Sequence, residues 1–298
     1  MGQTLVDTLL QGAVLAPLAM GMTLTYGVSG FANVAQVEFA TIGAYGTILV
    51  GAVVGGNLVV DTVLSIILTG GVAVGLYYIV FLRLLRRGST SALIGSLALS
   101  IAIRALIQTI TGPDPKVFNL PLERGINILG GNIAPTALRV SLLSLGAVVL
   151  SLAMLRFTPL GRRIRAVSTN PELAAAAGID ARRVVSVTWM IAGMLGAIAG
   201  VVLAVQTQVT LEMGFGLLLP VFGAVLLGGI GSVGPGPVVA AYLLAAVESL
   251  PLYVNLGSPL GANLLVPFDY RPAIGFVVLV AVLILRPQGL FGRAARRA

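Results

Sequence analysis

The sequence predicts an all-α membrane protein, a polytopic bundle of eight or nine transmembrane helices. Hydrophobic residues make up 57% of its 298 residues, and the mean hydropathy is +1.04. Charged residues make up only 9%, whereas a soluble domain has about 25%. A soluble fold of this size could neither bury so many apolar residues nor cover itself with so few charges. The apolar residues also occur in runs of about 20, the length that a membrane helix needs.

Nine windows of the chain are candidate spans. The count is eight or nine because the second window begins in polar sequence and only a Gly/Pro turn divides the seventh from the eighth. Nine spans of about 22 residues take up about 200 residues, so we expect one transmembrane domain over 1–298. The windows are 5–27, 34–56, 58–82, 91–111, 136–156, 184–206, 215–231, 234–254 and 270–286.

The arginines predict the orientation of the spans. They cluster after the third, fifth and ninth windows, within residues 83–87, 156–183 and 286–297. With nine spans these clusters share one side of the membrane, which the positive-inside rule assigns to the cytoplasm. The nearly balanced loop 112–135 then lies outside. We therefore expect a multi-pass protein of the plasma (inner) membrane with a cytoplasmic C-terminus.

Several classes of function are excluded by what the sequence lacks. With no Cys and no His, thiol nucleophiles, haem ligation and imidazole catalysis are excluded, and we expect no cofactor or metal in this chain. The phosphate-binding pattern G-x-x-x-x-G-K-[ST] is absent, since Val117 follows the single lysine, Lys116. We therefore expect no enzyme activity. The net charge of +8 lies in loops between apolar runs, so no nucleic-acid partner is expected.

The segment 157–183 predicts a short helix outside the membrane. Its local sequence contains an N-cap, a proline suited to the first helical position, an acid in the first turn, four alanines and a terminal glycine. Two interpretations remain open: the helix docks into a groove of a cytoplasmic partner, or it is a connector whose arginines contact anionic lipid. The residues are Asn170, Pro171, Glu172, 174–177 and Gly178.

Polar residues after the first span predict a broken helix near residues 28–43. Asn33, Gln36 and Glu38 interrupt the apolar pattern there, and Tyr45 follows. Irregular backbone at membrane depth is tolerated where it is buried or lines a cavity. Asn33, Gln36 and Glu38 therefore either line the passage or its gate, or form a hydrogen-bond network that holds the break in place. Tyr45 either lines the passage or packs between helices.

Charged residues inside the predicted spans need partners. Arg104 lies within the fourth span and requires an anion or a water-filled cavity. Glu38 and Glu248 are candidate partners, although no sequence pattern pairs either of them with Arg104. Arg104 either forms a structural ion pair or binds a carboxylate of the substrate. Glu212 falls in an outer turn, where it is either exposed or in contact with a partner.

Glycines spaced four residues apart predict close packing between helices. Three such pairs occur, and packing within the chain explains them more simply than a dimer interface does. They are Gly51/Gly55, Gly71/Gly75 and Gly196/Gly200.

The short helix and its flanks resemble the coupling segment of ABC importer permeases. The sequence is Asn170-Pro-Glu-Leu-Ala-Ala-Ala-Ala-Gly178-Ile179, preceded by Gly161-Arg-Arg-Ile-Arg-Ala166. More narrowly, the chain is similar to the branched-chain amino acid permease family, which includes urea and amide permeases. Further blocks agree and occur in the expected order: Gly21-Met-Thr-Leu-Thr-Tyr26, Gly223-Ala-Val-Leu-Leu-Gly228-Gly229 and Leu285-Arg-Pro287-Gln-Gly289.

One departure concerns the polar break. The family usually has Ala-His-Gly-Glu where this chain has Ala35-Gln36-Val37-Glu38. The departure removes a titratable group but keeps the acid. The departure therefore bears on which substrate is carried more than on whether the chain is a transporter.

The resemblance implies the transmembrane permease subunit of an ATP-driven importer for branched-chain or related amino acids, or alternatively for urea or short amides. It implies a second homologous permease in a heterodimer or a homodimer, two ATPase subunits that bind ATP and Mg, and an external binding protein. Membrane lipid surrounds the assembly. The residues that would couple to an ATPase are Asn170, Pro171, Glu172, Ala175, Ala176, Gly178 and Ile179, with Arg162 and Arg165.

A secondary transporter or channel driven by an ion gradient is the alternative class. Such proteins also use broken helices near the middle of the membrane. Against this alternative, the chain shows no convincing inverted repeat, and the capped cytoplasmic helix would have no evident role.

Overall fold

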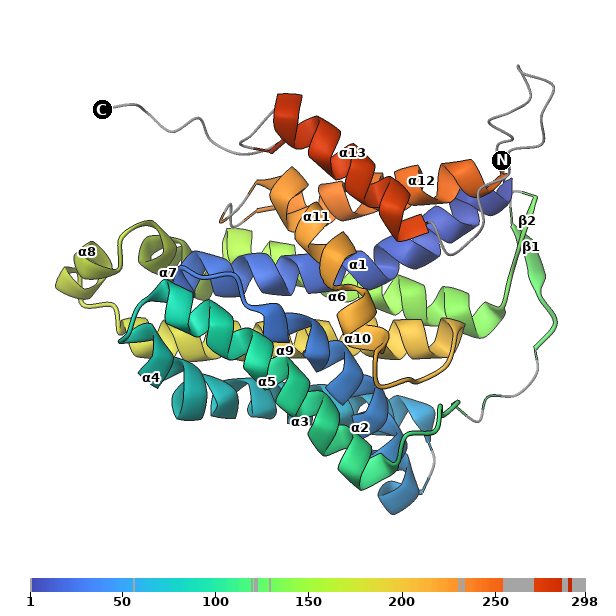
Figure 1. Ribbon diagram of the computed structural model, residues 1–298, viewed down its shortest axis with the longest axis horizontal. Coiled ribbons are helices and arrows are strands. Elements are labelled where there is room, and N and C mark those ends of the chain that lie inside the picture. Colours follow the sequence, from blue (N-terminus) through green and yellow to red (C-terminus); the bar gives the residue numbers. More distant parts are fainter. Residues whose placement is uncertain are drawn as a thin grey trace.

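The computed structural model describes residues 2–253 and 271–290, except 56, 119, 121–122, 129, 230, 232–233 and 286–288. This part of the chain forms an elongated bundle of helices (Figure 1). The prediction of an all-α polytopic membrane bundle is confirmed.

Among the described residues, six helical segments are long and apolar enough to cross a membrane. In four of them a single α-helix makes up the segment, and in the other two a short turn of different pitch adjoins it. They are α1 (Gly2–Ser29); the 3₁₀ turn η1 (Val34–Val37) with α2 (Glu38–Val54); α3 (Leu58–Leu76) with the π turn η2 (Tyr77–Phe81) and α4 (Leu82–Leu85); α5 (Ser89–Thr111); α6 (Pro135–Phe157); and α9 (Ala181–Gln206).

The remaining three windows contain shorter apolar helices. They are α11 (Leu218–Gly228), α12 (Gly236–Tyr253) and α13 (Arg271–Leu285), and the four-residue helix α10 (Met213–Gly216) precedes α11. The window 215–231 was predicted as one span, but α11 has 11 residues. That is about 16 Å of helix, about half the thickness of the bilayer core. The preceding residues instead fold back into the bundle, where the Gly214 backbone packs against Val37 and Thr41.

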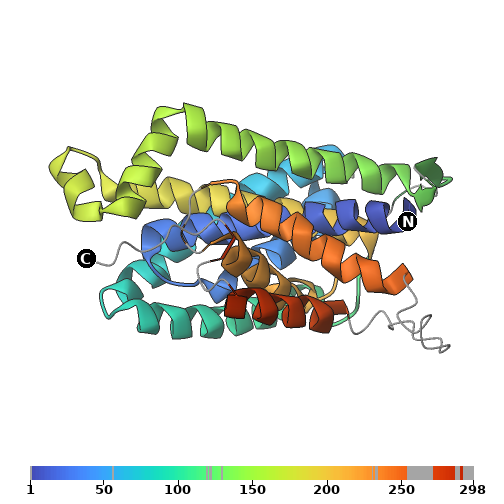
Figure 2. The same cartoon turned by 90° about the horizontal axis from the view of Figure 1, so that it is seen from above.

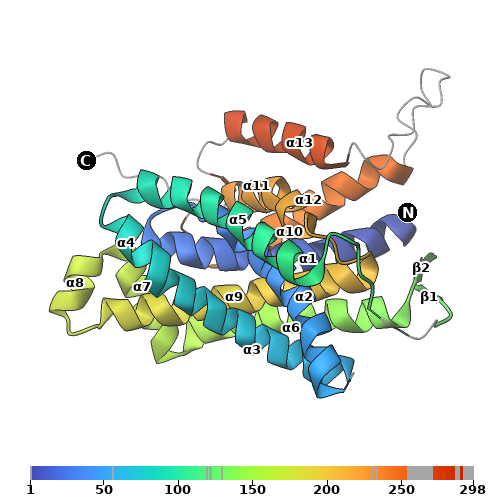
Figure 3. The ribbon, with the colours of Figure 1, turned by 60° about the horizontal axis from the view of Figure 1, so that its bottom comes forward.

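The centre of the bundle consists of α1 and α9, the two most buried of the long helices. Helices α11, α12 and α13 lie on one side of this centre, and α2 and α3 lie on the other (Figures 1 and 3). Glycines allow α9 to approach α2: a side chain at Gly196 would overlap Phe39, and one at Gly200 would overlap the carbonyl of Ala40. That pair fits the packing prediction, whereas Gly71 and Gly75 have nothing within 4 Å.

The two ends of the bundle differ in charge and structure. At one end, α4 and α6 terminate beside α7 (Pro159–Thr169) and α8 (Pro171–Ala176) (Figure 1). The arginine clusters within 83–87 and 156–183 therefore share this end, as a positive-inside arrangement requires. The arginines of the third predicted cluster and the loop 255–269 lie outside the described residues.

The opposite end contains a small hairpin that the sequence did not predict. Strands β1 (Ile126–Ile128) and β2 (Gly131–Ile133) pair antiparallel, with Ile126 opposite Ile133. The hairpin packs on the start of α1, where the backbone N–H of Asn132 donates to the Gln3 side chain at 2.9 Å.

Candidate functional site

The predicted break lies between α1 and α2 and forms an elbow inside the bundle, here defined as residues 30–38. Helix α1 ends at Ser29, and Gly30 has a φ of 71°, which turns the chain. All four residues of η1 are buried, and η1 contacts α1, α2, α5, α9 and α11. The break predicted near 28–43 is thus confirmed. It is shorter than predicted because Gly27 and Gly43 lie inside regular helices.

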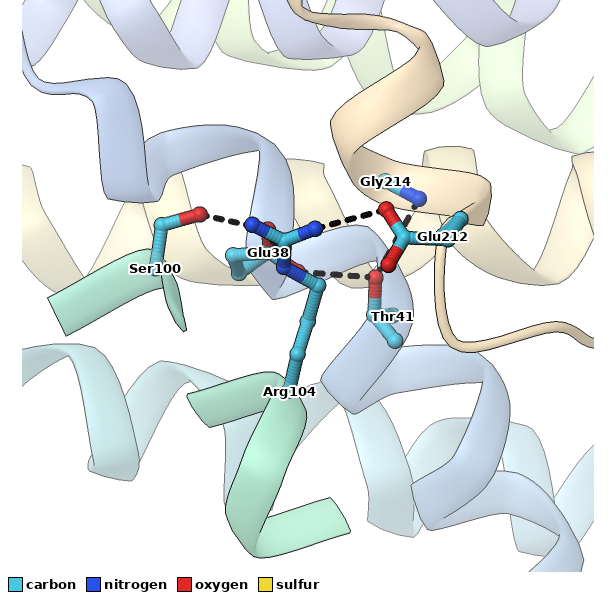
Figure 4. Close-up of polar contacts among 6 residues, drawn as sticks. All are labelled: Glu38, Thr41, Ser100, Arg104, Glu212 and Gly214. Carbon is cyan, nitrogen blue, oxygen red and sulfur yellow. Dashed lines mark hydrogen bonds and ion pairs between the residues drawn. The ribbon is translucent and has the colours of Figure 1, made fainter. Parts of the chain in front are cut away.

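Glu38, at the end of the elbow, is fully buried and surrounded by donors (Figure 4). Its Oε1 accepts a hydrogen bond from the Ser100 hydroxyl at 2.7 Å, and its Oε2 accepts one from Thr41 at 3.2 Å. The Nε atom of Arg104 forms an ion pair with Oε1 at 3.4 Å. A buried carboxylate is costly unless it is paired and hydrogen-bonded, and this one meets both conditions.

Arg104 joins this buried acid to an exposed one. Its Nη1 lies 2.6 Å from Oε2 of Glu212, and its guanidinium lies 4.3 Å from the centre of the Phe215 ring. The side chain of Glu38 is 0% exposed and that of Glu212 is 70% exposed. The contact ties α5 to the segment before α10, and the Gly214 N–H donates to Thr41 at 3.2 Å beside it (Figure 4).

Of the two partners that we considered for Arg104, the structure brings Glu38 to it and not Glu248. Glu248 lies on α12 and faces Gly275 of α13. The partner that sequence analysis missed is Glu212, which is 108 residues from Arg104. No local pattern encodes a contact of that range.

The other candidate pathway residues are also buried. The side-chain N–H of Gln36 donates to the carbonyl of Ala192 on α9 at 2.9 Å. In the described part of the chain, both polar side-chain atoms of Asn33 and the hydroxyl of Tyr45 have no hydrogen-bond partner. Asn33, Gln36 and Glu38 thus meet in the elbow, whereas Tyr45 lies about two turns further along α2 beside Val209 and Met213.

The short helix predicted in segment 157–183 is α8, and its predicted caps are formed. The Asn170 side chain accepts hydrogen bonds from the N–H groups of Glu172 and Leu173, both at 3.0 Å. At the other end, Gly178 has a φ of 80°. The N–H groups of Gly178 and Ile179 donate to the carbonyls of Ala175 and Ala174, both at 3.0 Å. This Schellman arrangement satisfies carbonyls that would otherwise lack partners.

Helix α8 projects beyond the other helices at the arginine-rich end (Figure 2). Ala175 and Ala176 are exposed on it, together with Leu173, whose side chain is 69% exposed. Sequence analysis did not include Leu173 among the coupling residues, although a leucine among alanines is a visible signal. An exposed apolar tip on a helix with satisfied ends is suited to docking into a groove.

The two arginines that we assigned to coupling differ in placement. Arg162 is exposed. Arg165 is partly buried, and its Nη1 donates to the carbonyl of Leu155 in the last turn of α6. Arg165 therefore fixes α7 against α6, whereas Arg162 lies on the surface. Within the described residues, no group of three acids could hold a metal ion.

The family model described as "Branched-chain amino acid transport system / permease component" matches residues 4–285. The chain is 27% identical to the probable branched-chain amino acid transport permease protein LivH of Methanocaldococcus jannaschii, over 95% of this chain and 92% of that one. It is 29% identical to the high-affinity branched-chain amino acid transport system permease protein BraD of Pseudomonas aeruginosa, over 98% and 95%.

A solved structure shares the fold. The structure of PsaBC from Streptococcus pneumoniae in complex with Fab superposes with a TM-score of 0.51 at 15% identity, over 96% of this chain and 92% of that one. At this identity the similarity concerns the fold alone.

Proposed function

The chain belongs to the family of branched-chain amino acid transport permease components, and from this membership we propose that it moves branched-chain or related amino acids across the membrane. It is thus a permease component of an ABC importer. The observation that supports this substrate class is the match over residues 4–285, together with relatives named for the same amino acids over nearly their whole length. The family also favours ATP-driven import over the ion-gradient alternative.

We place the arginine-rich end in the cytoplasm by the positive-inside rule. In this orientation α8 projects toward the ATPase subunits, which bind ATP and Mg, and the hairpin end faces the binding protein. A second permease, identical or homologous, completes the passage. The chain itself performs no covalent chemistry, because its task is to rearrange helices around a solute.

The coupling we propose runs from α8 into the core of the bundle. Leu173, Ala175 and Ala176 seat in a groove of the ATPase, and the caps at Asn170 and Gly178 keep the helix rigid. Helix α9 begins directly after, at Ala181, and packs closely on α1 and α2. Movement of α8 is therefore passed to α9 and from there to the elbow.

We propose that the four candidate pathway residues support the wall of the passage from inside the protomer and do not line it. Asn33, Gln36, Glu38 and Tyr45 are buried within the protomer, and the hydrogen bonds of Gln36 and Glu38 hold α2, α5 and α9 together. This placement supports the network interpretation of the break. The part of the network that remains accessible to a solute is the Glu212 carboxylate.

Uptake into proteoliposomes tests the substrate and the energy source. The permease is reconstituted with the subunits that co-purify with it and its binding protein, and radiolabelled leucine is supplied outside. We expect uptake that needs ATP inside and is inhibited by excess isoleucine or valine. Uptake without ATP that is abolished by an ionophore would contradict ATP-driven import, and competition by urea or acetamide in place of valine would contradict the substrate class.

The same assay tests coupling. Glu172→Arg reverses the charge in the first turn of α8, where Glu172 is exposed, and we expect uptake to fall at least tenfold while the protein remains folded and inserted. Glu172→Gln removes the charge without reversing it and serves as the matched control, with a smaller loss. Normal uptake by Glu172→Arg would contradict the coupling role.

A further inference from the structure

A cavity of 470 Å³ lies at the arginine-rich end of α6. It is separate from the elbow and from the exposed tip of α8. Three parts of the chain form its walls: the last two turns of α6, one residue of α7 and the residues just before α12. Its lining is Val149, Leu152, Ala153, Leu155, Arg156, Phe157, Arg165, Gly234 and Pro235.

The polar part of this cavity is cationic. Arg156 and Arg165 are its charged lining residues, and no acid lines it. Arg165 is held in place by its hydrogen bond to the carbonyl of Leu155, which leaves some of its five N–H donors available. In the described part of the chain, Arg156 has no hydrogen bond or ion pair, and its guanidinium lies 5.8 Å from the centre of the Phe157 ring.

The remainder of the cavity is apolar and belongs to a surface that faces lipid. Val149 is 55% exposed and Phe157 is 76% exposed. Leu143 and Leu150 are each 71% exposed on the same helix, as expected for a span in contact with hydrocarbon. From Arg156 to Val149 the helix rises about 10 Å. The cavity thus has a charged mouth at the level of the headgroups and an apolar wall that continues into the membrane.

We propose that this cavity binds one anionic phospholipid. Its phosphate contacts Arg156 and Arg165, and an acyl chain lies along Val149, Leu152 and Ala153. Basic pockets between helices at the membrane surface bind anionic headgroups, and guanidinium groups form strong charge-assisted bonds with phosphate. A soluble anion would satisfy the arginines but would leave the apolar wall uncovered, and the volume lies within the range of small-molecule sites, about 300–1,000 Å³.

The proposed lipid lies close to the segment that carries α8. It lies between the end of α6 and α7, and α7 leads directly into α8. A bound phospholipid therefore lies next to the connection that leads from α6 to α8.

Native mass spectrometry of the detergent-purified permease, titrated with lipids of identical chains, tests the proposal. We expect one phosphatidylglycerol to bind about tenfold more tightly than phosphatidylcholine. Arg156→Gln should weaken the binding of phosphatidylglycerol about fivefold or more, since each arginine near a headgroup contributes about 1 kcal/mol. Arg163→Gln removes the same charge from an exposed residue of α7 outside the cavity and should leave binding unchanged.

A second variant tests the apolar wall. Ala153→Phe fills the path of the acyl chain while both arginines remain, and it should also weaken the binding of phosphatidylglycerol. Gel filtration and thermal melting of each variant establish that it is folded. Equal affinity for the two lipids, or equal losses in Arg156→Gln and Arg163→Gln, would overturn the proposal. Displacement of the lipid by 10 mM inorganic phosphate, with the affinity of Ala153→Phe for phosphatidylglycerol unchanged, would assign the site to a free anion and overturn it too.

Discussion

Arg104 is the residue on which the polar interior depends. It neutralises Glu38, which is fully buried, and it also contacts Glu212 at the surface. These two contacts have different energies. A buried ion pair that loses one partner leaves an uncompensated charge, which costs about 3–5 kcal/mol, whereas an exposed pair contributes about 0–1 kcal/mol.

This difference predicts the effect of substitutions in the network. Arg104→Gln should destabilise the permease by about 3–5 kcal/mol, and Glu212→Gln, its control at the other carboxylate, by less than about 1 kcal/mol. Thermal melting in detergent measures both. The double variant Glu38→Gln with Arg104→Gln should regain most of the loss, because the buried charge is then gone. Equal small losses for the two single variants would show that Glu38 is not held by Arg104.

At this scale the sequence predicted the presence of the buried charges but not their pairing. Glu38 and Arg104 were identified because charges within a span need partners. Their contact depends on how η1 turns against α5, and the contact with Glu212 depends on the fold-back before α10. Neither arrangement has a local pattern, since Glu38 and Arg104 lie 66 positions apart and Arg104 and Glu212 lie 108 positions apart.

At the scale of the elements, the structure depends on how closely α9 approaches α2. Gly200 lies against the carbonyl of Ala40, whereas Gly71 on α3 has nothing within 4 Å. The same spacing of glycines therefore has a packing role in one helix and none visible in the other. Sequence alone could not separate the two, because spacing does not say which face meets a neighbour.

The two glycines provide a matched pair of substitutions. Gly200→Ala should destabilise the permease by about 1–3 kcal/mol, because the added methyl group forces the two helices apart. Gly71→Ala should be neutral or stabilising by up to about 1 kcal/mol, since alanine favours the helix and meets no neighbour. Thermal melting of both variants measures these changes in stability. A larger loss in Gly71→Ala would contradict the packing described here.

Local signals explain which elements could be predicted. Helix α8 was predicted with its caps because Asn170 and Gly178 specify its ends within a few residues. The hairpin β1–β2 was missed, since three-residue strands leave too short a pattern. The division of the seventh window was missed because α11 is apolar enough to resemble the end of a full span. The helix begins only after α10, where Gly214 lies against Val37 of the elbow.

At the scale of the whole molecule, the proposed orientation depends on the difference between the two ends of the bundle. The arginine clusters within residues 83–87 and 156–183 lie where α7 and α8 project, and the hairpin lies at the opposite end. The sequence contains no cysteine, so single cysteines report the side on which a residue lies without any background.

Labelling with a membrane-impermeant maleimide therefore tests the orientation. In intact cells Arg124→Cys, near the hairpin, should react at once. Ala176→Cys, on α8, should react only after the membrane is opened. Both positions are exposed, so access rather than burial decides the outcome. The reverse pattern would place α8 outside and would contradict coupling to a cytoplasmic ATPase.

The most direct test of the central claim is to find out what α8 touches in the assembled transporter. A photo-activated cross-linking amino acid replaces Leu173, at the exposed tip of α8, and Leu143, an exposed residue of α6, serves as the control. We expect irradiation of membranes to join position 173 to a P-loop ATPase subunit and position 143 to no ATPase. A transporter that remains active in uptake yet gives no ATPase adduct at position 173 would contradict the account.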